Sequence, residues 1–196
     1  KGFLRKAKIL AEKNVSMLKD LISEESPLIG LEPSAILAFR DEYPELVGDE
    51  LKEDAWKLAE YTLMIDEFLV REMDAGRINR DMFTTEEKHI LLHGHCHQKA
   101  VASTTPTLRM LAFPENYKVS EIPSGCCGMA GSFGYEKEHY DVSMKVGELV
   151  LFPAVRKASP DTLIAAPGTS CRHQIHDGTG RIAYHPIEIL YQALKK

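Results

Sequence analysis

The sequence predicts an α/β fold in which mainly parallel sheets are flanked by helices. Segments with helical spacing of apolar residues alternate along the chain with short apolar segments of strand length. This alternation is typical of parallel sheets with helical crossovers. Some strand-like segments, such as residues 88–95, contain consecutive rather than alternating apolar residues, as in strands that are buried on both faces. A hydrophobic fraction of 44% and a charged fraction of 27% fit a globular protein.

Each expected element follows from its own pattern. Helices are expected where apolar residues recur every three or four positions, about one helical turn. Ser34 stands where an N-cap is expected, and Pro106 lies in the first turn of a helix. The expected elements, in order, are a helix over residues 1–25, a strand and turn over 26–34, a helix over 34–46, one or two helices over 48–76 that end at Gly76, a loop over 79–85, a strand over 88–95, a helix over 105–113, a strand over 116–125, a long helix over 137–159, a strand, turn and helix start over 160–175, and a last strand with a closing helix over 180–196.

A weak internal repeat suggests two related units. Residues 3–35 and 139–171 align without gaps, and each has a long helix, an apolar strand and a turn that contains serine. The first segment ends in Ala35 where the second ends in Cys171. We therefore expect an incomplete, helix-rich first unit without cysteines over residues 1–80 and a complete second unit over residues 81–196. The chain begins with Lys inside a helical pattern, so we interpret it as an excerpt of a longer protein.

Composition excludes several classes of protein. The net charge of −5 argues against a nucleic-acid partner. No run approaches the roughly 20 apolar residues of a transmembrane segment, and no secretory signal is recognisable. Four cysteines are too few for a disulfide scaffold of this length, which favours a reducing compartment such as the cytoplasm.

All four cysteines follow predicted strands: Cys96, the adjacent pair Cys126 and Cys127, and Cys171. Because the carboxyl ends of parallel strands meet at one edge of a sheet, we expect the four sulfurs to gather there. Neighbouring Cα atoms are about 3.8 Å apart, too close for an ordinary disulfide between the adjacent pair. Four thiolates suit an iron–sulfur cluster or a zinc ion.

Glycines and histidines surround these cysteines. In a continued strand, His93, His95 and His97 would share one face and Cys96 would take the other. His97 and His173 each lie near a cysteine and are candidates for a ligand, a proton carrier or a hydrogen-bond donor to a ligand. Three glycines are expected to let the backbone approach the centre closely: Gly125, Gly128 and Gly131.

Two alternatives to the iron–sulfur centre stay open. The first is a structural zinc site in a docking module, in which His97 or His173 replaces one thiolate. The second is a thiol–disulfide module, in which Cys96 or Cys171 forms a disulfide with one of the adjacent pair. A nucleotide site is not expected, because the chain contains neither a dinucleotide-binding glycine pattern nor a P-loop lysine.

Three segments resemble a known family: "HGHCHQKA", "SGCCGMAGSFGYEKEHYDVSMKVGELVLFPAVR" and "GTSCRHQI". They are similar to the cysteine-rich CCG domain of iron–sulfur oxidoreductases, which include heterodisulfide reductase and the iron–sulfur subunit of glycolate oxidase. The sequence resembles most closely the C-terminal part of fused FAD/FMN-containing dehydrogenases of the D-lactate and D-2-hydroxyglutarate type. The resemblance is strong over residues 88–196 and weaker over residues 1–45.

The resemblance implies an electron-transfer domain of a flavin- and iron–sulfur-dependent 2-hydroxy acid dehydrogenase, inactive by itself. It implies a cluster of the 4Fe–4S type on the four cysteines. It also implies FAD-binding and ferredoxin-like domains upstream in the polypeptide, a quinone or redox protein as acceptor, and a location in the cytoplasm or peripherally at the inner face of the membrane. The family's fifth cysteine falls at Gln174, which leaves the cluster type open. Gln174 and His95 join His97 and His173 as expected neighbours or alternative ligands of the centre.

Overall fold

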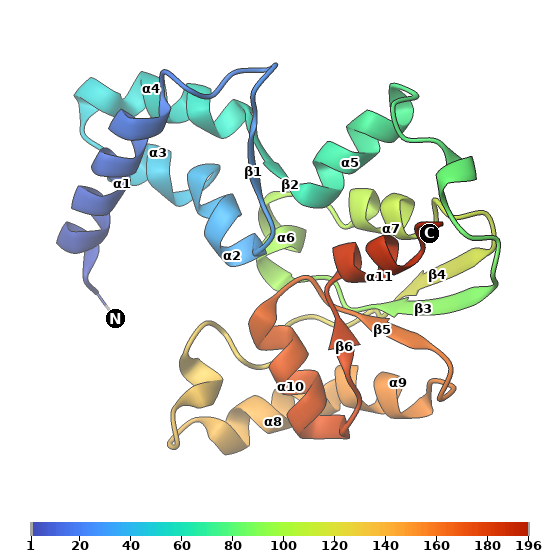
Figure 1. Ribbon diagram of the computed structural model, residues 1–196. Coiled ribbons are helices and arrows are strands. Elements are labelled where there is room, and N and C mark those ends of the chain that lie inside the picture. The colour runs from blue at the N-terminus through green and yellow to red at the C-terminus, as the bar shows by residue number, and fades with distance from the viewer. Residues whose placement is uncertain (1, 196) are drawn as a thin grey trace. The chain divides into compact units, whose positions relative to one another are not determined.

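The computed structural model describes residues 2–195 and divides into two compact units, one up to Phe68 and one from Leu69 on. Both units combine helices with parallel strands, which confirms the predicted fold class (Figure 1). In the described residues, antiparallel pairing is confined to one isolated bridge between Phe83 and Leu194. None of the described helices is long and apolar enough to cross a membrane. The idea that the units are repeats stays a prediction.

The first unit builds a two-stranded sheet among short helices. Its strands pair in parallel, with Ile29 opposite Leu63. Buried residues of α1 and α4, such as Val15 and Leu58, form its small core. Its elements are α1 (Leu4–Leu18), β1 (Leu28–Gly30), α2 (Pro33–Ile36), a short 3-10 helix η1 (Leu37–Phe39), α3 (Glu42–Leu46), α4 (Asp49–Glu60) and β2 (Thr62–Met64), and α5 (Ile65–Asp74) leads into the second unit.

Two details of this unit differ from the sequence-based expectation. Ser34 is not the N-cap, because α2 already begins at Pro33 and the Ser34 hydroxyl donates to the carboxylate of Glu32. Strand β2 interrupts the helical segment expected over residues 48–76. Its three residues are too short to reveal a period, and their pairing with β1 decides their conformation.

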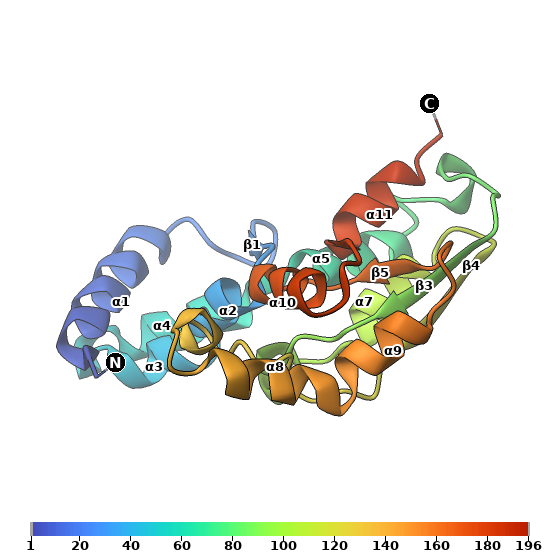
Figure 2. The same cartoon turned by 90° about the horizontal axis from the view of Figure 1, so that it is seen from below.

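The second unit contains a four-stranded parallel sheet in the order β4-β3-β5-β6. The strand expected over residues 88–95 ends at Leu92, and a helix absent from the prediction begins at Cys96. The predicted long helix is broken at Val150 into α8 and α9, which follow one another with a bend (Figure 2). After α5, the elements are η2 (Arg80–Met82), β3 (Lys88–Leu92), α6 (Cys96–Val101), α7 (Thr105–Leu111), β4 (Tyr117–Glu121), η3 (Phe133–Tyr135), α8 (Tyr140–Leu149), α9 (Leu151–Lys157), β5 (Leu163–Ala165), α10 (Thr169–Thr179), β6 (Ala183–Tyr184) and α11 (Pro186–Gln192).

Helices cover both faces of this sheet. Ile90 and Leu92 of β3 pack with residues of α7 and α11, whereas Leu91, between them, packs with residues of α9 and α10 on the opposite face (Figure 1). The alternation follows from the two-residue period of a strand. With both faces covered, the loops at the carboxyl ends of the strands are the natural place for a site.

Candidate metal centre

Three neighbouring strands bring the cysteines to one edge of the sheet. Strand β3 lies between β4 and β5, and the three run parallel. Cys96 follows β3, the pair Cys126 and Cys127 follows β4, and Cys171 follows β5. All four thiols are free. The three strands therefore deliver all the cysteines to the same carboxyl edge.

The four side chains form a continuous series of contacts. The thiol of Cys126 interacts with those of Cys96 and Cys127, and Cys127 in turn interacts with Cys171. Cys127 and Cys171 are 2% and 1% exposed, whereas Cys96 and Cys126 are partly exposed. The series thus has a buried end and an end near the surface. The assignment of the four cysteines as ligands stays a prediction.

The pKa values of the four thiols are shifted in opposite directions along this series. The neighbouring thiols of Cys127 and Cys96 lower the pKa of Cys126, and the backbone N–H groups of Gly128 and Ala130 stabilise the same thiolate. The Cys127 thiol, followed by the nearby imidazole of His93, also lowers the pKa of Cys171. Conversely, Cys126 raises the pKa of Cys96, and Cys126 and Cys171 together raise that of Cys127. The direction of the pKa shift therefore alternates along the series, because each thiol interacts with the next one.

Three glycines were predicted to let the backbone approach the centre closely. Of these, Gly128 is the position at which the structure most clearly requires glycine. Its φ of +104° is unfavourable for other residues, and a Cβ there would lie 2.2 Å from the carbonyl oxygen of Ser143. Its N–H donates to the Cys126 Sγ over 3.3 Å. Gly131 has a φ of +67°, but a Cβ at Gly131 or Gly125 would meet no described atom within 4 Å. A close approach of these two glycines to a bound group stays a prediction.

The turn before Cys171 is held by an arginine from the helix that carries this cysteine. The Arg172 guanidinium donates to the carbonyl oxygens of Ala166 and Pro167 over 3.0 and 2.8 Å. Gly168, which completes the turn, allows a close approach, because a Cβ there would lie 2.4 Å from Cδ2 of His95 and 3.3 Å from the Cys171 Sγ. The turn therefore packs His95 close to this cysteine.

Gln174 connects the loop that carries Cys126 and Cys127 to α8. It is buried, and its Nε2 donates to the carbonyl oxygen of Cys127 and to both the carbonyl and the hydroxyl of Ser143, over 3.1, 3.1 and 2.9 Å. At the position where the resemblance places a fifth cysteine, the chain thus carries a positioning side chain. A ligand role for Gln174 stays a prediction.

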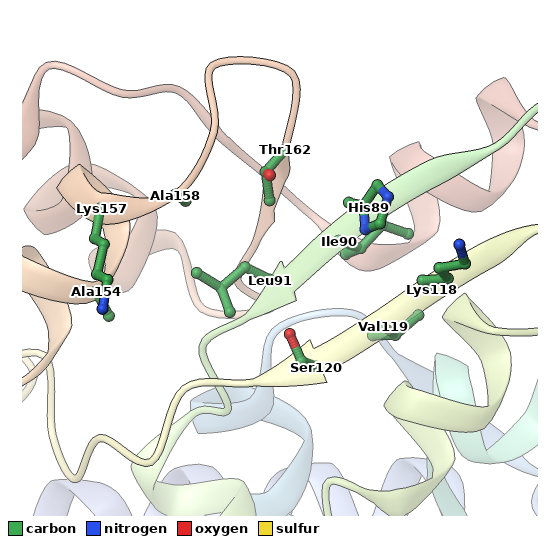
Figure 3. Close-up of a pocket in the computed structure, with 10 residues that line it drawn as sticks. All are labelled: His89, Ile90, Leu91, Lys118, Val119, Ser120, Ala154, Lys157, Ala158 and Thr162. Carbon is green, nitrogen blue, oxygen red and sulfur yellow. The ribbon is translucent and has the colours of Figure 1, made fainter.

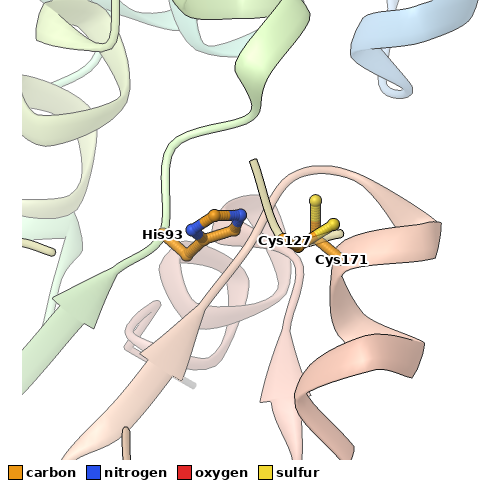
Figure 4. A group of neighbouring side chains, drawn as sticks. All are labelled: His93, Cys127 and Cys171. Atoms are coloured by element: carbon orange, nitrogen blue, oxygen red, sulfur yellow. The ribbon is translucent and has the colours of Figure 1, made fainter. Parts of the chain in front are cut away.

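His93 is a neighbour of the cysteines that the sequence did not single out as a ligand. Its side chain is 0% exposed, and its Nδ1 lies 2.8 Å from the hydroxyl of Ser124. Ligand atoms of His93, Cys127 and Cys171 all lie within 4.8 Å of one another (Figure 4). The expected shared face of three histidines does not arise, because β3 ends before them. In the sequence, only one feature could have indicated His93 as a neighbour of the cysteines. It follows directly after an apolar strand, at the carboxyl edge of the sheet where the four cysteines lie, which we call the cysteine edge.

The other histidines lie in different surroundings. His95 is buried and precedes α6, and its Nδ1 has no hydrogen-bond partner within residues 2–195. His97 is partly exposed in the first turn of α6. His173 is exposed on α10, and its Nδ1 lies 2.7 Å from the hydroxyl of Tyr135. Roles for these three at the centre stay predictions.

A groove elsewhere on the second unit contains none of the predicted site residues (Figure 3). It lies beside β3 and β4 and is bordered by α9. Its lining residues are His89, Ile90, Leu91, Lys118, Val119, Ser120, Ala154, Lys157, Ala158 and Thr162. The cysteine edge, rather than this groove, gathers the reactive side chains.

Comparison with known proteins finds relatives among dehydrogenases. The chain is 27% identical over its whole length to a D-2-hydroxyglutarate dehydrogenase of Escherichia coli (strain K12), of which it covers 18%. It is 30% identical, over 98% of its length, to one subunit of the anaerobic glycerol-3-phosphate dehydrogenase of the same strain, and it covers 47% of that subunit. A D-2-hydroxyglutarate dehydrogenase of Pantoea ananatis is 28% identical over 99% of the chain.

These relatives confirm the resemblance to D-2-hydroxyglutarate dehydrogenases that the sequence indicated. The chain spans less than half the length of the curated relatives named above. No protein-family profile and no solved structure matches it. The similarity therefore concerns one segment of larger dehydrogenase proteins.

Proposed function

We propose that this chain is the C-terminal electron-transfer domain of a flavin-linked 2-hydroxy acid dehydrogenase and that Cys96, Cys126, Cys127 and Cys171 hold an iron–sulfur cluster. The observation that supports the proposal is the convergence of four free thiols from three parallel strands. Sulfur ligands of this number suit a 4Fe–4S-type cluster.

The donor set fits such a group. When bound, an iron–sulfur cluster accepts and releases single electrons. Cys127 and Cys171 would hold it at the buried end, where water has little access. Cys96 and Cys126 would hold it at the partly exposed end, where a redox partner can approach. The backbone amide of Gly128 already donates to one of these sulfurs, and such bonds tune a cluster's potential.

The relatives support a role in electron transfer rather than in substrate recognition. One is named for 2-hydroxyglutarate and another for glycerol-3-phosphate, yet both share this segment. A segment common to proteins named for different substrates has no need to choose between those substrates. We therefore assign oxidation of the substrate to FAD in an upstream domain, and passage of electrons to ferredoxin-like clusters and a quinone or redox-protein acceptor. Four free thiols in contact fit a reducing compartment.

One observation favours a second candidate, a structural zinc site. His93, Cys127 and Cys171 place one nitrogen and two sulfurs within 4.8 Å of one another. A fourth thiolate would complete a tetrahedral set of the kind zinc prefers. Such a site would make the chain a docking module without a redox role.

Metal analysis and anaerobic reconstitution distinguish these functions. Reconstitution with iron and sulfide should give the broad visible absorption of a cluster, together with bound iron and sulfide. Each single Cys→Ser variant should lose most of the iron, because serine oxygen replaces a soft sulfur ligand. Ser170→Ala, next to Cys171 in α10, is the matched control and should load like the parent protein.

Three results would contradict the iron–sulfur proposal. If all four Cys→Ser variants load as well as the parent, the cysteines are not the ligands. Freshly purified, colourless protein with about one zinc per chain would favour the structural site. Failure to bind either metal, together with fewer free thiols before mild reduction than after it, would favour a thiol–disulfide module.

A further inference from the structure

We infer that His93 supplies a nitrogen ligand to the metal centre through Nε2 and that Ser124 holds its ring in position. The inference rests on the proposed function and deepens it. His93 is then a fifth ligand beside the four cysteines, so the centre has mixed thiolate and imidazole ligands rather than thiolates alone.

The first support is an unpartnered nitrogen at the buried end of the cysteine series. His93 is 0% exposed, and its Nε2 has no hydrogen-bond partner among the residues that the structure describes. Two candidate ligand sulfurs, those of Cys127 and Cys171, lie within 4.8 Å of a ring nitrogen of His93. Figure 4 shows one ring nitrogen of His93 directed toward the sulfurs of Cys127 and Cys171. Because Ser124 engages Nδ1, the nitrogen available to a metal is Nε2.

The second support is the contact that orients the ring. Ser124 lies in the loop after β4, two residues before Cys126, and its hydroxyl is 2.8 Å from Nδ1. Lys99 donates to the carbonyl oxygen of Ser124 over 2.8 Å and so fixes the loop. Without a metal, the ring can donate from Nε2 to the Cys171 sulfur. A metal ion would replace that proton, and Nδ1 would then keep its own proton and donate to the hydroxyl of Ser124, which leaves the lone pair of Nε2 for the metal. Histidine ligands of metals are typically held by such a bond from their other nitrogen.

The neighbouring histidine provides a matched comparison. His95 is also buried, also has an unpartnered ring nitrogen, and lies close to Cys171. Within residues 2–195, however, it belongs to no group of three ligand atoms as close as that of His93. Making the same substitution at His93 and at His95 therefore distinguishes a histidine that binds the metal from one that is only buried near the cysteines.

His93→Asn and His95→Asn are the informative variants. At position 93 the asparagine amide keeps a polar group near the position of Nδ1, where it can still bond to Ser124, but it has no atom at the position of Nε2. Circular dichroism and thermal unfolding check that both variants fold. Ser124→Ala is a third variant that removes only the orienting hydroxyl.

The test is nitrogen hyperfine coupling in pulsed electron paramagnetic resonance of the reconstituted cluster in its paramagnetic state. Isotopic labelling of histidine nitrogen assigns the signal. We expect the coupling in the parent and in His95→Asn, and its loss in His93→Asn. Ser124→Ala should retain the coupling with a changed orientation and bind iron about 10–100-fold more weakly, as loss of an outer partner usually does.

The outcomes separate this inference from the proposed function. A cluster that forms without histidine coupling, or coupling that persists in His93→Asn, would overturn the inference and leave the iron–sulfur proposal intact. Loss of the coupling in His95→Asn would also overturn it. If His93→Asn fails to fold, an unaltered signal in Ser124→Ala would count against it. If the parent takes up no iron, the proposed function fails, and X-ray absorption of the zinc-loaded parent, or cadmium NMR, tests for the nitrogen ligand.

Discussion

The two units of the chain share a pattern of elements but differ in the turns that follow their strands. Helices begin at Leu4 and Tyr140, and again at Pro33 and Thr169, so both pairs keep the 136-residue offset of the sequence repeat. At that offset the first unit has Ala35, which is exposed, where the second has Cys171, which is 1% exposed.

The difference shows that a similar strand-turn-helix framework does not by itself make a site. The first unit has two strands, so few strand ends meet at its edge. The second has four strands, and three of them contribute a cysteine-bearing loop. Neighbouring strands, and not one well-formed turn, supply the convergence of side chains that the proposed centre requires.

The largest expected effect comes from removing the buried ring that joins the helices of the second unit. Phe152 is fully buried, and a Cβ at Gly147 of α8 or Gly178 of α10 would lie 2.3 Å from its ring. We expect Phe152→Ala to lower the free energy of unfolding by about 3–5 kcal/mol, through lost contacts and a cavity. Because α10 carries Cys171, iron loading should fall as well. Denaturant unfolding and iron analysis measure the two effects.

The matched variant in the first unit is Leu58→Ala. Leu58 is 2% exposed in the core of that unit, and its truncation should cost about 2–5 kcal/mol. Under conditions in which the protein remains folded, iron loading should match that of the parent. Hydrogen exchange should show weaker protection mainly in the unit that carries the substitution. Equal loss of iron in both variants would mean that the cysteine edge depends on both units.

Several elements of the fold could be predicted because their patterns are local. The continuous apolar segment of β3 and the proline at the start of α7 are local signals. Strand β2 was missed because three residues carry no clear period and only the pairing with β1 fixes them. The break at Val150 lies within an amphipathic segment that otherwise has the pattern of one helix. Such errors arise where tertiary contacts override local preference.

The candidate site could be predicted only in part, for a similar reason. Cysteines after three apolar strands indicated convergence, since parallel strands share an edge. The partner of His93, the Ser124 hydroxyl, lies 31 residues away in the sequence and became apparent only in the fold. The same holds for Gln174, whose bonds to Ser143 depend on how α8 packs beside α10. Side-chain partners that are distant in sequence leave no local pattern.

An intermediate effect is expected from loosening the turn before Cys171. Arg172→Ala removes the donors to Ala166 and Pro167, so the cysteine should be positioned less accurately. We expect about tenfold weaker iron binding, the lower end of the range for loss of a supporting contact. Arg40→Ala is the control, because Arg40 donates to Thr62 and Glu67 within the first unit. Iron titration should show weaker binding in Arg172→Ala than in Arg40→Ala. If both variants bind iron equally weakly, the turn before Cys171 has no particular role in positioning this cysteine.

The smallest effect is expected from giving the first unit the cysteine that it lacks. Ala35 is exposed in a short helix, so Ala35→Cys should change the free energy of unfolding by less than about 0.5 kcal/mol. The new thiol should react rapidly with a thiol reagent, while the iron content per chain stays that of the parent. One exposed thiol in this unit has no second sulfur from a neighbouring strand to share a metal. A rise in iron content would show that a single turn can begin a centre, and would contradict the view that convergence of strands is the requirement.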